Sequence, residues 1–225
     1  MLANAVPKPL SPTRVKRRRL PTAWLLAGLL MVLTFGLWLA SRGQVADLGS
    51  AQQMRDRGVY SAWDSNETIV LIRHAERCDR SNHACLNDPS GITVAGSQAA
   101  AAVGDGIRRL GLDRADLLGS PLVRTRQTAS FVFGKAIETQ DWLAQCNSAF
   151  ADAALAHKRE GHNLVLVTHS GCIDRLERQL GVSGGARGAG YASALFVAMG
   201  ADGEPRLLGQ LNASQWQTLV SSTGK

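Results

Sequence analysis

Short apolar runs alternate with longer periodic segments over most of the chain after residue 66. Two of these runs, Thr68–Ile72 and Asn163–Thr168, are apolar almost throughout, which is typical of strands buried on both faces of a parallel sheet. Ala115–Gly119 is another short run of this kind, and Ile137 lies in a further one. The spacing predicts strands at each of these places.

Periodic segments between the runs predict helices. They cover residues 93–110 (stopped by Gly111), 121–133 (with Pro121 at the start), 150–159 and 173–180. After a glycine-rich loop at residues 183–190, which we interpret as a flexible connection, two strands at 192–199 and 206–211 are predicted to form a hairpin. This alternation predicts an α/β fold with helices flanking a mostly parallel sheet.

A long uncharged segment precedes these elements. Residues 20–41 are 22 residues without a charged side chain, and as a helix they would span about 33 Å, enough for a hydrocarbon core of about 30 Å. Trp24 and Trp38 lie near its ends, where aromatic side chains favour the membrane interface. We therefore predict a transmembrane anchor. A cleaved signal peptide is the alternative, although its apolar core usually runs only about 7–15 residues.

The net positive charge is concentrated around this segment. Residues 1–42 hold seven of the 25 basic residues and no acidic one, which leaves 18 basic against 18 acidic residues in the remainder. The high pI therefore gives no reason to expect nucleic-acid binding. The basic cluster at 14–19 predicts, by the positive-inside rule, a cytoplasmic N-terminus and a domain on the periplasmic side of the inner membrane.

The same patterns divide the chain into four parts. Residues 1–19 are predicted to be a disordered cytoplasmic tail, residues 20–41 the anchor, residues 42–65 a polar linker with some helix around 52–57, and residues 66–220 the folded domain.

Four cysteines follow the anchor: Cys78, Cys85, Cys146 and Cys172. An even number in an exported domain is typical of disulfides, and four cysteines allow three pairings. Cys78 and Cys85 are seven residues apart in a loop-like stretch, so we favour this pair and, by remainder, Cys146 with Cys172. Free or buried thiols are the alternative. A zinc site is disfavoured because no CxxC or HxxxH spacing occurs.

Two predicted strands lead directly into a histidine, His74 after Arg73 and His169 after Thr168. Ligands of open α/β sheets bind at the carboxyl ends of the strands, so we expect both histidines at one edge. Ser120 follows the strand at 115–119, and Arg124 lies about one turn into the next helix. A guanidinium beside a helix N-terminus suits phosphate binding.

These residue types suit phosphoryl transfer through a covalent intermediate. A neutral imidazole is nucleophilic near neutral pH and can be phosphorylated on nitrogen. Arginines hold the anionic oxygens of the transferring group, and a second imidazolium can neutralise their remaining charge. With this much fixed positive charge, no metal ion and no cofactor is required.

Three motifs in chain order resemble the signature of the histidine phosphatase (phosphoglycerate mutase-like) superfamily. They are Arg73-His74-Ala75, the pattern Ser-x-x-x-Arg-Thr-x-x-Thr at Ser120, Arg124, Thr125 and Thr128, and Thr168-His169. The resemblance covers about residues 68–211 and implies a three-layer α/β/α domain. It implies the following roles: His74 as nucleophile, Arg73 and Arg124 as phosphate clamps, His169 as the histidine that stabilises the transition state, and Ser120 as a secondary phosphate contact.

A narrower resemblance concerns the substrate. The run Arg73–Ser81, together with Cys85-Leu86 and Gly91–Val94, is similar to that of periplasmic lipopolysaccharide core heptose phosphate phosphatases, whose cysteine placement also resembles that at 146 and 172. This similarity implies a phosphomonoesterase that acts on a phosphorylated sugar, such as lipopolysaccharide core heptose phosphate.

One position departs from the superfamily pattern. Many members place Glu or Asp after the third strand as the acid that protonates the leaving group, whereas Gln145 stands at the corresponding place here. Asp141, Glu138 and Glu76 are alternative acids, and the sequence does not choose among them. Gln145 also leaves open a catalytically impaired phosphate-binding or sensor protein of the same fold. A mutase is disfavoured, because export would remove it from glycolytic substrates.

Overall fold

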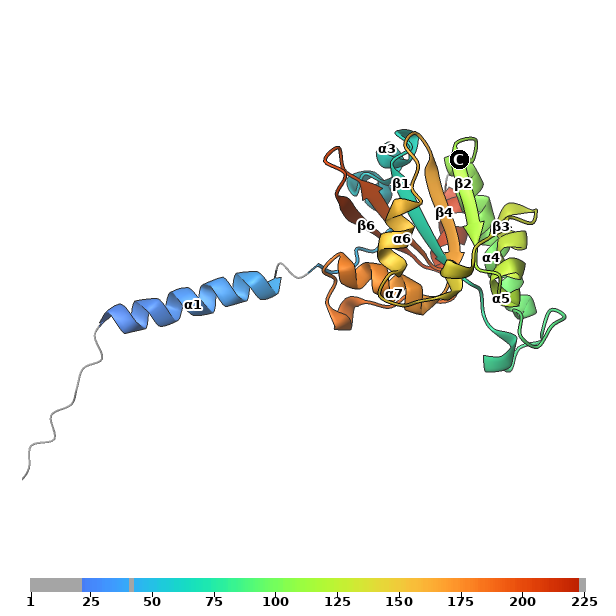
Figure 1. Ribbon diagram of the computed structural model, residues 1–225. Helices are drawn as coiled ribbons and strands as arrows, with labels where there is room; N and C mark the ends of the chain where they lie inside the picture. Colours follow the sequence, from blue (N-terminus) through green and yellow to red (C-terminus); the bar gives the residue numbers. More distant parts are fainter. Residues whose placement is uncertain (1–21, 41–42, 223–225) are drawn as a thin grey trace, which may run out of the picture. The chain divides into compact units, whose positions relative to one another are not determined.

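The computed structural model describes residues 22–40 and 43–222. The chain divides into two compact units, residues 1–41 and residues 42–225. The described part of the first unit is helix α1 (Thr22–Ala40) (Figure 1). Leu26, Met31 and Val32 on this helix are exposed. Across residues 22–40 and 43–222, no helix has the length and apolar character required to cross a membrane. The predicted tail at 1–19 and both ends of the predicted anchor at 20–41 lie outside the described residues, and the anchor stays a prediction.

A six-stranded mixed sheet forms the centre of the second unit, in the order β3-β2-β4-β1-β5-β6 (Figure 1). The strands are β1 (Thr68–Arg73), β2 (Ala115–Gly119), β3 (Glu138–Thr139), β4 (Asn163–Thr168), β5 (Ala194–Met199) and β6 (Pro205–Leu211). The first four pair in parallel, whereas β5 runs antiparallel to β1 and forms a hairpin with β6. The mostly parallel sheet with a late hairpin is therefore confirmed, although β3 begins one residue after Ile137.

Helices cover both faces of this sheet. They are α2 (Ala51–Asp56), α3 (Val59–Asp64), α4 (Val94–Leu110), α5 (Val123–Phe133), α6 (Phe150–Ala156), α7 (Ser170–Gln179) and α8 (Ala213–Ser222), with short 3-10 turns η1 (Cys78–Arg80), η2 (Asp141–Ala144) and η3 (Gly184–Ala186). Alternate strand side chains face opposite layers: Val70 packs in one core cluster with residues of α2 to α5 and α8, and Leu71 in the other with residues of α6 and α7. The three-layer α/β/α arrangement is confirmed.

Most predicted helix boundaries are close to the observed ones. Thr93 caps α4, its Oγ1 accepting a hydrogen bond from the Gly96 N–H at 2.9 Å, and Gly111 ends the helix with a φ of 88°. Helix α5 starts two residues after Pro121 and α6 ends before the predicted 159. Helix α7 begins at Ser170, three residues earlier than predicted, so it follows His169 without a loop.

Within the predicted polar linker at 42–65, the described residues 43–65 belong to the folded unit. They contribute α2 and α3 to the second unit, and Met54, Val59 and Trp63 are buried in its core. Trp63 Nε1 donates a hydrogen bond to the Gly111 carbonyl at 3.1 Å, which ties α3 to the end of α4. Helix α2 corresponds to the helix expected around 52–57, whereas α3, with six residues, gives too few turns for a periodic signal in the sequence.

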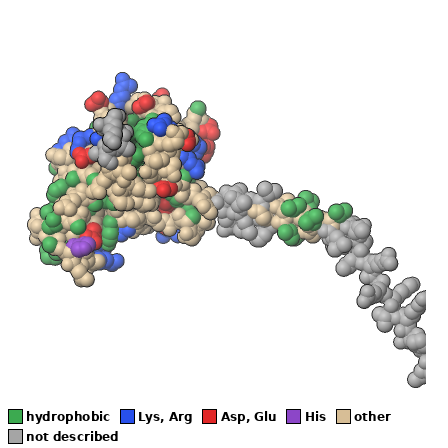
Figure 2. Space-filling view, turned by 180° about the vertical axis from the view of Figure 1, so that it is seen from behind, with side chains coloured by type: hydrophobic (Ala, Val, Ile, Leu, Met, Phe, Trp, Pro, Cys, Tyr) green, Lys and Arg blue, Asp and Glu red, His purple; other side chains and the backbone are tan. Residues whose placement is uncertain are grey.

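Charged side chains of both signs lie on one face of the second unit (Figure 2). Basic and acidic side chains are interspersed on the face seen in Figure 2, and the sequence from residue 43 onward has equal numbers of the two.

Candidate active site

The carboxyl ends of three adjacent strands bring His74, His169 and Ser120 together. In the sheet, β4 lies between β1 and β2. Hydrogen bonds continue beyond the strands: the His74 N–H donates to the Thr168 carbonyl and the Ser120 N–H donates to the Val167 carbonyl, both at 2.9 Å. The backbone of β4 therefore fixes both neighbours at one edge, where the sequence predicted them.

His74 is held as a neutral base with one nitrogen free. Its side chain is buried, and Nδ1 lies 2.8 Å from the Ala75 carbonyl oxygen. Because a carbonyl only accepts, Nδ1 carries the proton and Nε2 keeps its lone pair. Burial lowers the pKa of His74 to about 3, and the charges of His169, Arg124 and Arg73 act in the same direction. Without a ligand, the imidazole of His74 is therefore neutral at neutral pH, with its one proton on Nδ1.

His169 lies beside His74, with ring centroids 5.2 Å apart. Its Nδ1 is 3.4 Å from Arg124 Nη2 and its Nε2 is 3.0 Å from Ser120 Oγ. A guanidinium only donates, so Nδ1 accepts and Nε2 carries the proton. Burial lowers the pKa of His169 to about 4, helped by nearby arginines, first Arg124. The free site therefore holds a neutral second imidazole, where we expected an imidazolium.

Two arginines beside these histidines keep unused hydrogen-bond donors. Arg73 donates from Nη1 to the Ala189 carbonyl at 2.6 Å. The Nε atoms of Arg73 and Arg124 are both buried and have no hydrogen-bond partner among the described residues. A buried donor without a partner costs about 1–3 kcal/mol, and an anion bound between the two would satisfy both. Burial is also the main cause that lowers the pKa of each arginine.

The threonines of the second motif hold this arrangement together. Thr125 Oγ1 donates to the Ser120 carbonyl at 2.9 Å, which fixes the turn before α5. Thr128 Oγ1 donates to the Arg124 carbonyl at 2.7 Å and accepts from the Ala75 N–H at 2.9 Å. The motif thereby ties α5 to Ala75, the residue that follows His74. Both threonines of the motif therefore have a structural role.

The structure does not select a proton donor for the leaving group. Glu76 accepts hydrogen bonds from His83 and Thr93, which lower its pKa and keep it ionised. Glu138, the first residue of β3, and Asp141, the first residue of η2, are both exposed. Gln145, at the position of the expected acid, is exposed as well.

Two disulfides fix segments next to the site, Cys78–Cys85 and Cys146–Cys172. They are the pairs favoured from the sequence, and the described residues contain no free cysteine. Cys172 lies in the first turn of α7, three residues after His169, so its disulfide ties the segment around Gln145 to this histidine. Within residues 22–40 and 43–222, no group of three or more His, Cys, Asp or Glu side chains is placed to hold a metal ion.

Arg77 and Tyr191 also belong to this site, and no sequence pattern predicts Tyr191 there. The Arg73 guanidinium carbon lies 3.9 Å from the centroid of the Tyr191 ring, and that ring lies 5.7 Å from the His74 ring. The charge of Arg77 contributes to the lowered pKa of His169, and its Nε donates to Asp79 at 2.7 Å. Tyr191 follows a glycine-rich loop and belongs to no sequence motif, so its position in the site becomes clear only from the structure.

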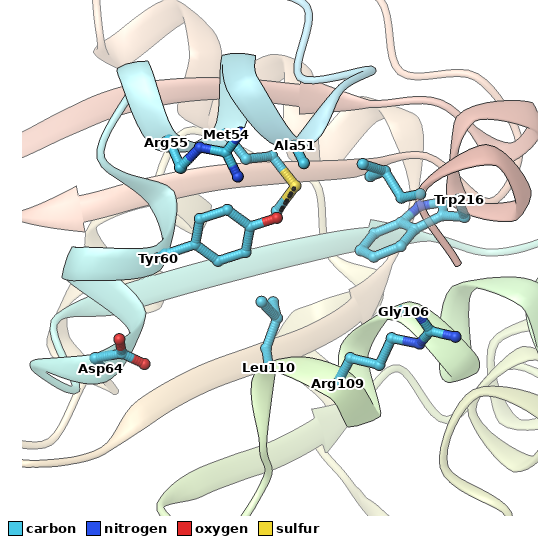
Figure 3. A pocket seen from close by; sticks show the side chains of 10 residues that line it. Ala51, Met54, Arg55, Tyr60, Asp64, Gly106, Arg109, Leu110 and Trp216 are labelled. Carbon is cyan, nitrogen blue, oxygen red and sulfur yellow. Dashed lines mark hydrogen bonds between the residues drawn. The ribbon is translucent and has the colours of Figure 1, made fainter. Parts of the chain in front are cut away.

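A separate cavity of about 620 Å³ lies between α2, α3, α4 and α8 (Figure 3). Met54, Tyr60, Leu110 and Trp216 form its apolar walls, with Arg55, Arg109 and Asp64 among its lining residues. Helix α3 leads into the amino end of β1, and Leu110 precedes the amino end of β2. The cavity therefore lies at the amino ends of these strands, opposite the carboxyl ends that carry His74.

Comparisons with known proteins agree with this geometry. Residues 69–147 match the histidine phosphatase superfamily (branch 1). The lipopolysaccharide core heptose(II)-phosphate phosphatase of Escherichia coli (strain K12 / DH10B) is 36% identical over 136 residues, which cover 52% of this chain and 68% of the relative. This identity, together with the 68% of the relative that the chain covers, places both proteins in one family.

Two solved structures have a similar fold. Phosphoserine phosphatase from Entamoeba histolytica, in complex with 3-phosphoglyceric acid, gives a TM-score of 0.53 at 18% identity and covers 67% of this chain and 98% of its own. The protein histidine phosphatase SixA, complexed with tungstate, gives 0.53 at 15% identity and covers 65% and 97%. From its sequence matches and its fold, the chain belongs to the histidine phosphatase superfamily.

Proposed function

We propose that this chain is a metal-independent phosphomonoesterase that works through a phosphohistidine intermediate. The observation that carries this proposal is the pair of buried Nε–H donors of Arg73 and Arg124, which have no hydrogen-bond partner in the described part of the chain and whose guanidinium charges act on His74. Fixed positive donors around a neutral nucleophile match the demands of an anionic phosphoryl group.

The proposed reaction has two steps. In the first, His74 Nε2 attacks phosphorus, the bond from phosphorus to the ester oxygen breaks, and that oxygen takes a proton from solvent water as the alcohol leaves. Arg73 and Arg124 hold the equatorial oxygens, while His169 Nε2–H and Ser120 Oγ–H are further donors on the same side. In the second step, water attacks phosphorus, the N–P bond breaks, and phosphate leaves with His74 restored.

We further propose that the substrate is a phosphorylated sugar, such as lipopolysaccharide core heptose phosphate. Support comes from the 36% identical relative of that activity and from Arg77 and Arg80, which add positive charge where an anionic substrate would enter. The alternative, a phosphate-binding or sensor protein of the same fold, keeps its support from Gln145.

Hydrolysis of p-nitrophenyl phosphate by the full chain in excess EDTA tests the activity. We expect turnover that EDTA does not change. We also expect the activity to persist down to about pH 5, because His74 of the free enzyme stays neutral well above its pKa of about 3. A panel of sugar phosphates then ranks the substrates. Strict dependence on a metal ion would contradict the mechanism, and phosphate binding without turnover would favour the sensor.

We also propose that residues 20–41 anchor the chain in the inner membrane, with the catalytic domain in the periplasm. Support comes from the uncharged segment behind the basic cluster at 14–19, from exposed leucines on α1, and from the two disulfides, which suit an oxidising compartment. A β-lactamase fused after Lys225 should protect cells from ampicillin. Sensitive cells that contain the intact fusion would place the domain in the cytoplasm.

A further inference from the structure

The glycine-rich loop and the residue that follows it form one wall of the candidate site. Ala189, near the end of this loop, is buried, and its carbonyl accepts the 2.6 Å hydrogen bond from Arg73 Nη1. Tyr191, two residues later, lies under the Arg73 guanidinium, 3.9 Å from ring centroid to Cζ. The segment predicted to be a flexible connection therefore contacts Arg73 through Ala189, and Tyr191, just after this segment, makes a second contact.

This wall is fixed to both neighbouring elements. Arg187 in the loop pairs with Asp174 of α7 at 3.1 Å. On the other side, the Ala192 N–H donates to the His74 carbonyl at 3.3 Å, and Ser193 Oγ donates to the Gly190 carbonyl at 2.8 Å. The backbone on both sides of Tyr191 is thus attached to α7 and to the residue proposed as nucleophile.

The contacts leave Arg73 with a defined set of unused donors. An arginine side chain loses rotamer entropy when it is held in one conformation. The Ala189 carbonyl takes one N–H and the Tyr191 ring covers one face of the guanidinium, whereas Nε remains buried without a partner. A guanidinium stacked on an aromatic ring keeps its N–H donors in the ring-parallel plane, free for hydrogen bonds.

We propose that Tyr191 is a positioning residue for the proposed phosphatase reaction: its ring supports the Arg73 guanidinium so that the unused N–H donors face the phosphoryl group next to His74. This inference rests on the proposed function. The hydroxyl of Tyr191 also acts on Arg73 through a side-chain hydrogen bond that raises the arginine's pKa, and Tyr191 influences the pKa values of Arg77 and Arg124, so the ring and the hydroxyl must be tested separately.

Four variants of the full chain separate these roles: Tyr191→Phe, Tyr191→Leu, Arg73→Ala and the double variant Tyr191→Leu/Arg73→Ala. We expect Tyr191→Phe to stay within about two-fold of the unchanged chain, and Tyr191→Leu to lower kcat/KM for p-nitrophenyl phosphate by about 3- to 30-fold. Affinity for inorganic phosphate, measured by calorimetry, should fall in parallel. In the Arg73→Ala background, Tyr191→Leu should have no further effect.

Tyr60→Leu is the matched control, because Tyr60 lies in the cavity at the opposite sheet edge, and its kcat/KM should be unchanged. Circular dichroism shows whether each variant is folded. A loss in Tyr191→Phe as large as in Tyr191→Leu would assign the role to the hydroxyl and overturn the proposal, as would a full additional loss in the Arg73→Ala background. If the unchanged chain binds phosphate but shows no turnover, the proposed function is refuted and the Tyr191 proposal is not. In that case, phosphate affinities from calorimetry still test whether Tyr191 positions Arg73.

Discussion

Replacement of His74 by glutamine is expected to lower kcat for p-nitrophenyl phosphate by about 10,000-fold or more, because removal of a covalent nucleophile eliminates the pathway itself. Glutamine keeps much of the side-chain volume but offers no nucleophilic nitrogen. The buried position of His74 and the hydrogen bond from Nδ1 to the Ala75 carbonyl leave Nε2 as the attacking atom. Steady-state kinetics of the purified full chain measures the loss.

Trapping of the intermediate makes this prediction specific. Rapid quenching in alkali after mixing with a radiolabelled phosphate ester should leave label on the unchanged chain, in an acid-labile bond, and none on the His74→Gln variant. His162→Ala is the matched control: His162 immediately precedes β4 at the opposite end of the strand from His169, and its activity should be unchanged. Label that persists in His74→Gln, or turnover near that of the unchanged chain, would assign the nucleophile to another residue.

The parts of the fold that the sequence predicts well are those with strong local patterns. Strands β1 and β4 are apolar on both faces because both faces are covered by helices, so their runs stand out. Both lead into a histidine, and parallel pairing of β1 with β4 then places the two histidines side by side. The proximity of His74, His169 and Ser120 could thus be predicted from chain order and strand direction alone.

Other parts depend on contacts that no local pattern records. Tyr191 reaches Arg73 across more than one hundred residues of chain, and nothing in a glycine-rich loop indicates that it is anchored. The protonation state of His169 likewise depends on burial and on three neighbouring arginines. Short helices such as α2, and the terminal helix α8 with its buried Trp216, are stabilised by packing on the sheet and not by their own periodicity.

Loss of the second clamp should have the next largest effect. Arg124→Ala is expected to lower kcat/KM by about 100- to 1,000-fold, the usual loss when one fixed donor to a developing charge is removed. The substitution leaves His74 intact, so a phosphohistidine still forms, but slowly. Arg124→Lys should recover only part of the loss, because an ammonium keeps the charge without the planar arrangement of donors.

A second consequence of Arg124→Ala concerns His169. After burial, the charge of Arg124 is the strongest influence that lowers the pKa of His169 to about 4. Its removal should therefore raise this pKa, so that protonation of His169 begins at a higher pH than in the unchanged chain, as measured by NMR titration of the imidazole. The matched control is Arg126→Ala, an exposed arginine two residues further along α5, which should leave both kcat/KM and the titration unchanged. Equal losses in the two variants would mean that total positive charge, and not the placed guanidinium of Arg124, supports the reaction.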